Sequence, residues 1–161
     1  MLFRSESQYS KTPGQTFSAT SAAGYAGITA AIKAFVEVSD ALTPADRSAV
    51  LAAIAGSVSY DSVYHDLGGF MKRMNDSAGL PTAVRNAAAG VQSALATAVT
   101  AKSADDRNSS GLSIFIPAEV TANNLATYRA DAAAFCAATG WDTFLEWLGP
   151  TVSPSSWRPP A

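Results

Sequence analysis

The chain has 161 residues, 48% of them hydrophobic, so it is long enough for one domain with its own core and too short for two comfortable ones. Its formal net charge is -2, and its 11 Lys and Arg residues are scattered singly, which excludes a basic stripe along a phosphate backbone. A single cysteine excludes an internal disulfide framework and a Cys/His metal cluster. We therefore predict no nucleic-acid partner, no metal site and no cofactor.

The sequence contains no apolar run of signal-peptide or transmembrane length. We therefore expect no membrane contact. A signal peptide encoded upstream of Met1 would leave no trace in these residues. The cellular compartment is therefore left open, and the parent protein could be secreted.

The first two thirds of the chain predict a loop followed by helices. Residues 5–20 are rich in Ser, Thr, Gln and Gly, which is typical of a loop. Apolar residues recur at helical spacing from Ser21 to about Asp40, and Thr43 to Asp46 offers a cap for a second helix that reaches about Ser59. Asp66 is expected to cap a short helix, and an alanine-rich helix follows Pro81 and extends to about Val99.

One convincing strand follows a polar loop at residues 102–110. It covers residues 111–117 (GLSIFIP), where Leu112, Ile114 and Ile116 share one face and Phe115 makes the other face apolar too. Such a strand needs neighbours for its backbone groups, and the sequence offers only a weak candidate at residues 2–3. We therefore expect that part of the fold is missing from this chain.

The C-terminal region predicts two more helices and a tail. The first runs from Asn123 to Gly140, a left-handed C-terminal cap, and Asp142 is expected to cap a short last helix. Aromatic residues at helical spacing in the last helix indicate a cluster that closes the core: Trp141, Phe144 and Trp147. The predicted domain covers residues 1–150, and residues 151–161 form a Pro-rich tail.

Several of these segments resemble the clostripain family of cysteine peptidases. Residues 64–70 (YHDLGGF) resemble a stretch that opens a helix in that family, residues 111–117 resemble its GLSIYFP strand, and residues 128–145 resemble its closing helix and Trp-x-x-Phe-Leu ending. A weaker match lies at residues 2–14, which resemble the end of a strand with a Ser-Glu pair and the Pro-Gly turn after it. The order of these segments along the chain is that of the family.

The resemblance implies an α/β fold, specifically the C-terminal part of a caspase-like α/β sandwich, mostly helical here with one clear strand at about 111–117. It also implies a His/Cys dyad that cleaves after Arg or Lys. In the family both catalytic residues lie upstream of the Ser-Glu strand, so this chain lacks counterparts for them. We therefore expect a non-catalytic C-terminal portion, inactive alone. Its implied partners are the N-terminal portion of the same peptidase domain and, through it, a protein or peptide substrate. The alternative is a stand-alone helical binding or scaffold module.

His65 and Cys136 occur in the order of the family's dyad, but their settings do not favour catalysis. Cys136 lies late in a helix among Phe135 and alanines, where a packed structural thiol is expected. His65 precedes a helix cap and is expected to be structural. Asp66, like Glu6 and Asp61, could bind a basic substrate side chain, although capping explains Asp66 more simply. We assign no catalytic, cofactor-binding or metal-ligating residue to this chain.

Overall fold

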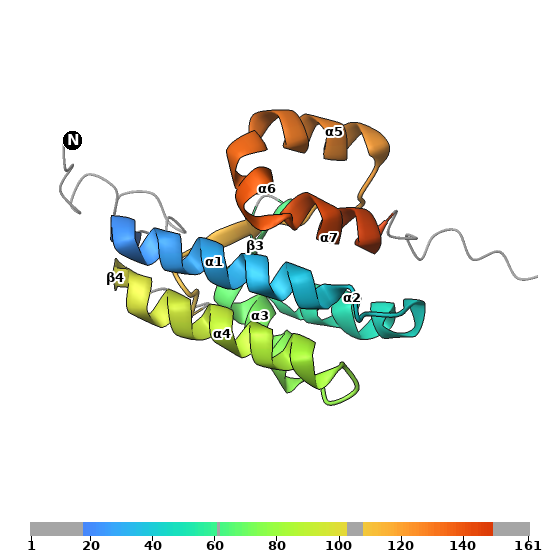
Figure 1. Cartoon of the computed structure of the whole chain (residues 1–161), viewed down its shortest axis with the longest axis horizontal. Coiled ribbons are helices and arrows are strands. Elements are labelled where there is room, and N and C mark those ends of the chain that lie inside the picture. Colours follow the sequence, from blue (N-terminus) through green and yellow to red (C-terminus); the bar gives the residue numbers. More distant parts are fainter. Residues whose placement is uncertain (1–17, 61, 103–107, 150–161) are drawn as a thin grey trace, which may run out of the picture.

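A computed structural model describes residues 18–60, 62–102 and 108–149 of the chain. The fold is mixed α/β and mostly helical, with two small antiparallel sheets (Figure 1). The expected features at residues 2–14 and 151–161, together with Glu6 and Asp61, lie outside the described residues.

The long helices form one layer of the molecule. Helix α1 (Ala22–Ser39) packs along α4 (Thr82–Ala98), and α3 (Leu67–Asp76) contacts both α4 and α2 (Arg47–Gly56) (Figure 1). The α1–α4 pair is close, since a Cβ added at Gly24 would lie 2.6 Å from the Cα atom of Ala98. The small side chains of the alanine-rich helix thus permit close helix packing, as the sequence indicates.

Capping residues set where the helices of this layer begin. Ser21 accepts a hydrogen bond from the backbone N–H of Gly24, which confirms the predicted start of α1. Thr43 and Asp46 form a capping box around a short 3-10 helix, η2 (Pro44–Asp46), which leads into α2. The predicted end of the second helix, at about Ser59, is wrong, because α2 ends at Gly56 and Ser59 begins a strand.

The clear strand is present, but the expectation that the chain offers it no partner beyond a weak candidate at residues 2–3 is wrong. The strand is β5 (Ser113–Phe115), shorter than residues 111–117, and it pairs antiparallel with β3 (Tyr64–Asp66), which pairs in turn with β2 (Ser59–Tyr60). In this sheet Tyr64 lies opposite Phe115. Strand β3 was not predicted from the sequence, because three residues are too few to show an alternating pattern before the helix begins.

A second sheet joins the start of α1 to the end of α4. Strand β1 (Ser18–Thr20) pairs antiparallel with β4 (Val99–Lys102), which directly continues α4. Residues 18–20, expected in a loop, and Val99, expected in a helix, are thus both in strands.

The C-terminal helices form a second layer above the first. The single helix predicted from Asn123 to Gly140 is broken at Ala132 into α5 (Ala122–Asp131) and α6 (Ala133–Thr139). Gly140 has a φ of 68°, which confirms the left-handed cap. Helix α7 (Trp141–Leu148) follows at once, so Gly140 is its N-cap and the prediction that Asp142 caps it is wrong.

Aromatic rings join the two layers into one core among the described residues. Phe35 of α1 contacts Phe70 of α3 and Phe144 of α7, with ring centroids 6.5 and 5.5 Å apart. Trp141 is completely buried among these rings, whereas Trp147 is only partly buried at the edge of the cluster. The expected core-closing cluster is thus confirmed for Trp141 and Phe144.

Candidate functional site

Asp66 lies at the junction of β3 and α3, where its buried carboxylate accepts three hydrogen bonds. One oxygen, Oδ2, accepts from the backbone N–H of Gly69 at 2.7 Å, which confirms the predicted helix cap. The other, Oδ1, accepts from the backbone N–H and the hydroxyl of Ser110 at 2.7 and 2.9 Å. The carboxylate thus joins the start of α3 to the chain just before β5 through three hydrogen bonds.

Gly68 makes this junction possible. A Cβ at this position would lie 2.4 Å from the Cβ of Ser110, and the Gly68 N–H donates to the Ser110 hydroxyl at 3.0 Å. A side chain at position 68 would therefore collide with Ser110, and glycine permits the close approach of the two segments.

His65 on β3 is buried and bonded to Ser57, at the end of α2. Its Nδ1 atom lies 2.9 Å from the Ser57 hydroxyl, which donates to the carbonyl of Ile54 at 2.6 Å. The single hydroxyl hydrogen is used by Ile54, so Nδ1 is the donor to the serine oxygen. Burial lowers the pKa of His65, which favours the neutral ring. This arrangement attaches α2 to the sheet and does not prepare the serine as a nucleophile.

Cys136 lies on α6 and is partly exposed. Burial, followed by the negative charge of Asp142, raises the pKa of its thiol. A nucleophilic cysteine needs the opposite shift, toward the thiolate. Within the described ranges no hydrogen bond joins Cys136 to His65, whose Nδ1 is bonded to Ser57. The two residues thus lie in separate surroundings, Cys136 on α6 and His65 against Ser57.

Neither a metal-ligand group nor a membrane-spanning helix is found in the described part of the chain. There, no group of three His, Cys, Asp or Glu residues is placed to hold a metal ion. Nor is any helix found there that is long and apolar enough to cross a membrane.

A groove of about 510 Å³ lies between α5 and the three-stranded sheet. We call it the aromatic groove, because Tyr64, Phe115 and Tyr128 line it. The rings of Phe115 and Tyr128 are stacked with centroids 4.5 Å apart, and Tyr64 meets Phe115 edge-on at 5.8 Å. Burial raises the pKa of Tyr128, so its hydroxyl stays protonated. The remaining wall is made of small and polar residues: Val63, Pro117, Asn123, Asn124, Thr127, Asp131 and Ala132.

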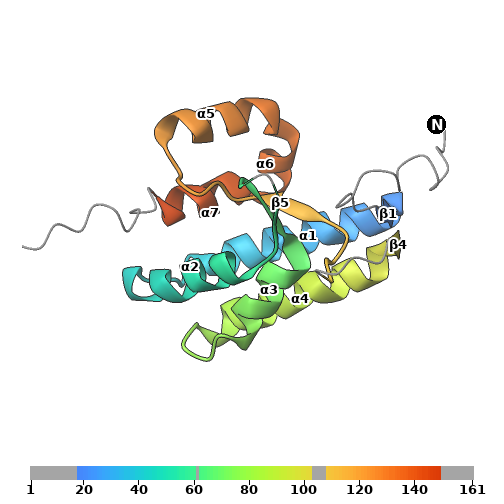
Figure 2. The ribbon, with the colours of Figure 1, turned by 180° about the vertical axis from the view of Figure 1, so that it is seen from behind.

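The register of the sheet creates the aromatic groove. Tyr64 and Phe115 are opposite each other on neighbouring antiparallel strands, so their side chains share one face of the sheet. Helix α5 covers that face and adds Tyr128 (Figure 2). The opposite face carries Ile114, which is buried in the core.

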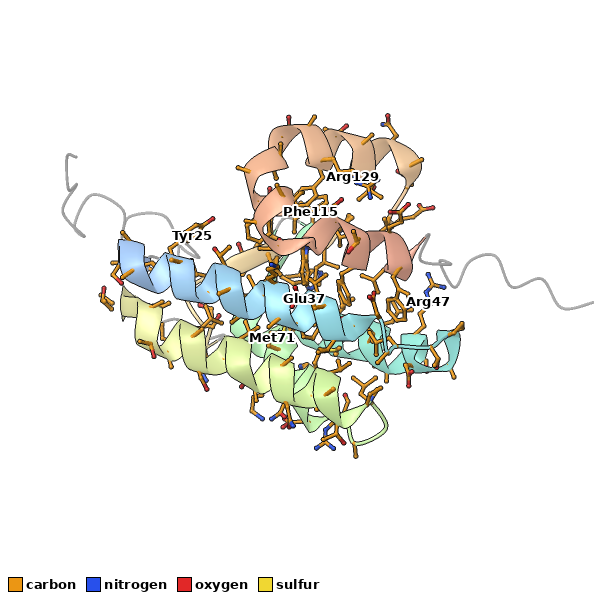
Figure 3. The ribbon with its side chains drawn as sticks, in the orientation of Figure 1. Tyr25, Glu37, Arg47, Met71, Phe115 and Arg129 are labelled. Carbon is orange, nitrogen blue, oxygen red and sulfur yellow. The ribbon has the colours of Figure 1, made fainter. Side chains whose placement is uncertain are left out.

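Arg129 holds α5 in place above α7. Its Nε atom is 2.7 Å from the carboxylate of Asp142, and its Nη2 atom is 2.7 Å from that of Glu146. Figure 3 shows Phe115 below α5 and Arg129 on α5 itself, on the side of α7. Exposed ion pairs stabilise weakly, but two carboxylates on successive turns fix the rotation of α5 and hence the orientation of Tyr128.

Comparison with protein-family models, with curated proteins and with solved structures found no match. The fold and its sites define a mostly helical α/β protein with two small antiparallel sheets and an aromatic groove of about 510 Å³. The sequence did not point to the groove, because its three rings come from three different elements and show no local spacing.

Proposed function

We propose that the chain is the C-terminal, non-catalytic portion of a clostripain-like cysteine endopeptidase that cleaves after Arg or Lys when complete. In this proposal the chain completes the core and one wall of a caspase-like α/β sandwich. The observation that carries the proposal is that the three resembling segments meet around β5. Trp141 donates its indole N–H to the carbonyl of Phe115 at 2.9 Å, and the N–H of Leu67 donates to the carbonyl of Leu112 at 2.9 Å.

The contacts among the three resembling segments support the view that these segments belong to one structural unit. Asp66, in the first segment, bonds Ser110 immediately before the second, and the two residues are 44 positions apart. Trp141 and Phe115, in the third and second segments, are 26 positions apart. Residues that resemble one family at separate places in a sequence are expected to touch if they were retained for a common core.

The outer edge of β5 supports the proposal, because it carries backbone groups with which a further strand would pair. The N–H of Leu67 donates to the carbonyl of Leu112, and the N–H of Ile116 donates to the carbonyl of Val63. Because alternate residues of an antiparallel strand bond to the same neighbour, the backbone groups of Ser113 and Phe115 point away from β3. In the described part of the chain, the Ser113 N–H and C=O have no hydrogen-bond partner, whereas the Phe115 carbonyl is bonded by Trp141. A strand from the N-terminal portion would thus pair first through Ser113.

Activity measurements test this proposal. The chain alone is expected to leave fluorogenic peptides ending in Arg or Lys intact. A longer protein that also includes the upstream coding region is expected to cleave them. Turnover by the chain alone that is abolished by Cys136→Ala would overturn the proposal, because Cys136 would then be a nucleophile.

A stand-alone helical binding or scaffold module is the second candidate, favoured by two observations. Strand β3 lies within the chain and pairs one edge of β5. No buried side-chain nitrogen or oxygen among the described residues lacks a hydrogen-bond partner. A sharp, reversible unfolding transition of a monomer would favour this candidate, whereas association or incomplete folding of the chain alone would favour the peptidase portion.

A further inference from the structure

The aromatic groove has the chemistry of a site for a proline-rich segment. We propose that it binds residues 150–161 of this same chain, whose sequence is PTVSPSSWRPPA. Segments in the polyproline II conformation dock into aromatic-lined grooves, since their conformation is preformed and little entropy is lost on binding. This inference is independent of the proposed peptidase relationship.

The exposed aromatic surface is the first argument. The side chain of Tyr64 is 44% exposed. Among the residues that the structure describes, Tyr64 and Tyr25 are the two large hydrophobic residues that are exposed. Tyr64 stands edge-on to Phe115, which stacks on Tyr128, so the groove offers adjoining ring faces and edges. Proline rings and the Trp157 side chain of the segment are suited to such surfaces.

Charge complementarity is the second argument. Asp131 lines the groove and makes no ion pair with any described residue, because the neighbouring cation, Arg129, is held by Asp142 and Glu146. The segment 150–161 carries one charged side chain, that of Arg158. A guanidinium at Asp131 would therefore add a charge-assisted hydrogen bond to the apolar contact.

The reach of the segment is the third argument. It follows Gly149, directly after α7, and Figures 1 and 2 show that α7 ends on the side of the molecule where α5 begins. Arg158 follows Gly149 by nine residues, which would span about 28 Å at ~3.1 Å per residue in polyproline II. Helix α5, which forms one wall of the groove, is about 15 Å long at ~1.5 Å per residue. A segment that follows this wall is thus long enough to bring Arg158 from the start of α5 to Asp131, at its end.

A spin label on the segment tests the proposal in the full chain. Cys136→Ala removes the native thiol, and Ser156→Cys then accepts a nitroxide next to Trp157 and Arg158, both left intact. In the ¹⁵N-labelled protein we expect several-fold weakening of the amide signals of Tyr64 and Asp131. The signal of Ser93, on the exposed face of α4, is expected to keep its intensity.

Matched variants identify the contacts. Tyr64→Ser and Asp131→Asn are each expected to restore most of the lost signal. Their controls, Tyr25→Ser and Asp40→Asn, alter similar exposed side chains outside the groove and are expected to change nothing. Restoration by the controls to the same extent would overturn the proposal.

Two further outcomes would also overturn it. One is weakening that is absent from the groove or equal over the whole surface. The other appears in a mixture of ¹⁵N-labelled chain without nitroxide and nitroxide-labelled chain without ¹⁵N: if the groove signals weaken there as much as in the singly labelled protein, the occupant belongs to a second copy.

Discussion

Asp66→Ala is expected to be strongly destabilising, because the buried carboxylate of Asp66 accepts hydrogen bonds from three donors. Loss of a helix N-cap costs about 1 kcal/mol. Removal of the second oxygen leaves the backbone N–H of Ser110 without its acceptor at 2.7 Å, at a cost of about 1–3 kcal/mol. The free energy of unfolding should thus fall by about 2–4 kcal/mol, a large share of the ~5–15 kcal/mol typical of a domain.

Urea unfolding followed by tryptophan fluorescence measures this loss, since Trp141 is buried in the core and reports its opening. Asp66→Asn keeps one acceptor oxygen and is expected to lose less than Asp66→Ala. Asp46→Ala is the matched control, because Asp46 also caps a helix but bonds only Thr43, in an exposed position. A loss for Asp66→Ala no greater than that for Asp46→Ala would refute the argument that the bonds to Ser110 matter.

Three other changes follow from the structure. Burial lowers the pKa of His65, so below the ordinary pKa of 6.5 the unfolded chain binds more protons at this residue than the folded chain does. The contribution of His65 to the free energy of unfolding is full above pH 6.5 and declines as pH falls toward the folded-state pKa. His65→Gln should flatten this pH dependence in urea unfolding. Trp141→Phe leaves the carbonyl of Phe115 unbonded and should cost about 1–3 kcal/mol; urea unfolding is followed here by far-UV circular dichroism, because the variant lacks the buried tryptophan that reports unfolding by fluorescence. Gly140→Ala forces a φ of 68° on alanine and should lower stability by about 1–2 kcal/mol; unchanged stability would show that the α6–α7 junction relaxes.

The helices were predictable because their signals are local. Apolar residues at helical spacing place the buried face of α1, and Ser21, Asp66 and Gly140 mark ends that the structure confirms. The break at Ala132 was not visible, since alanine favours helix on both sides of it and the change of direction depends on how α6 packs against α1.

The sheet and the aromatic groove were not predictable because they depend on contacts between distant residues. His65 and Asp66 are polar in the sequence yet buried in the fold, where Ser57 and Ser110 satisfy them. The groove requires the register that places Tyr64 opposite Phe115, and no pattern within either segment specifies that pairing.

The most direct test of the peptidase proposal is the nucleotide sequence immediately upstream of the codon for Met1. The account predicts a segment, in frame or across an assembly break, that encodes a His-Gly motif followed by an Asp-x-Cys motif and ends in the strand before the Ser-Glu pair. An unrelated gene, separated from this one by a stop codon and a ribosome-binding site, would contradict the account and leave the non-catalytic binding module as the better description.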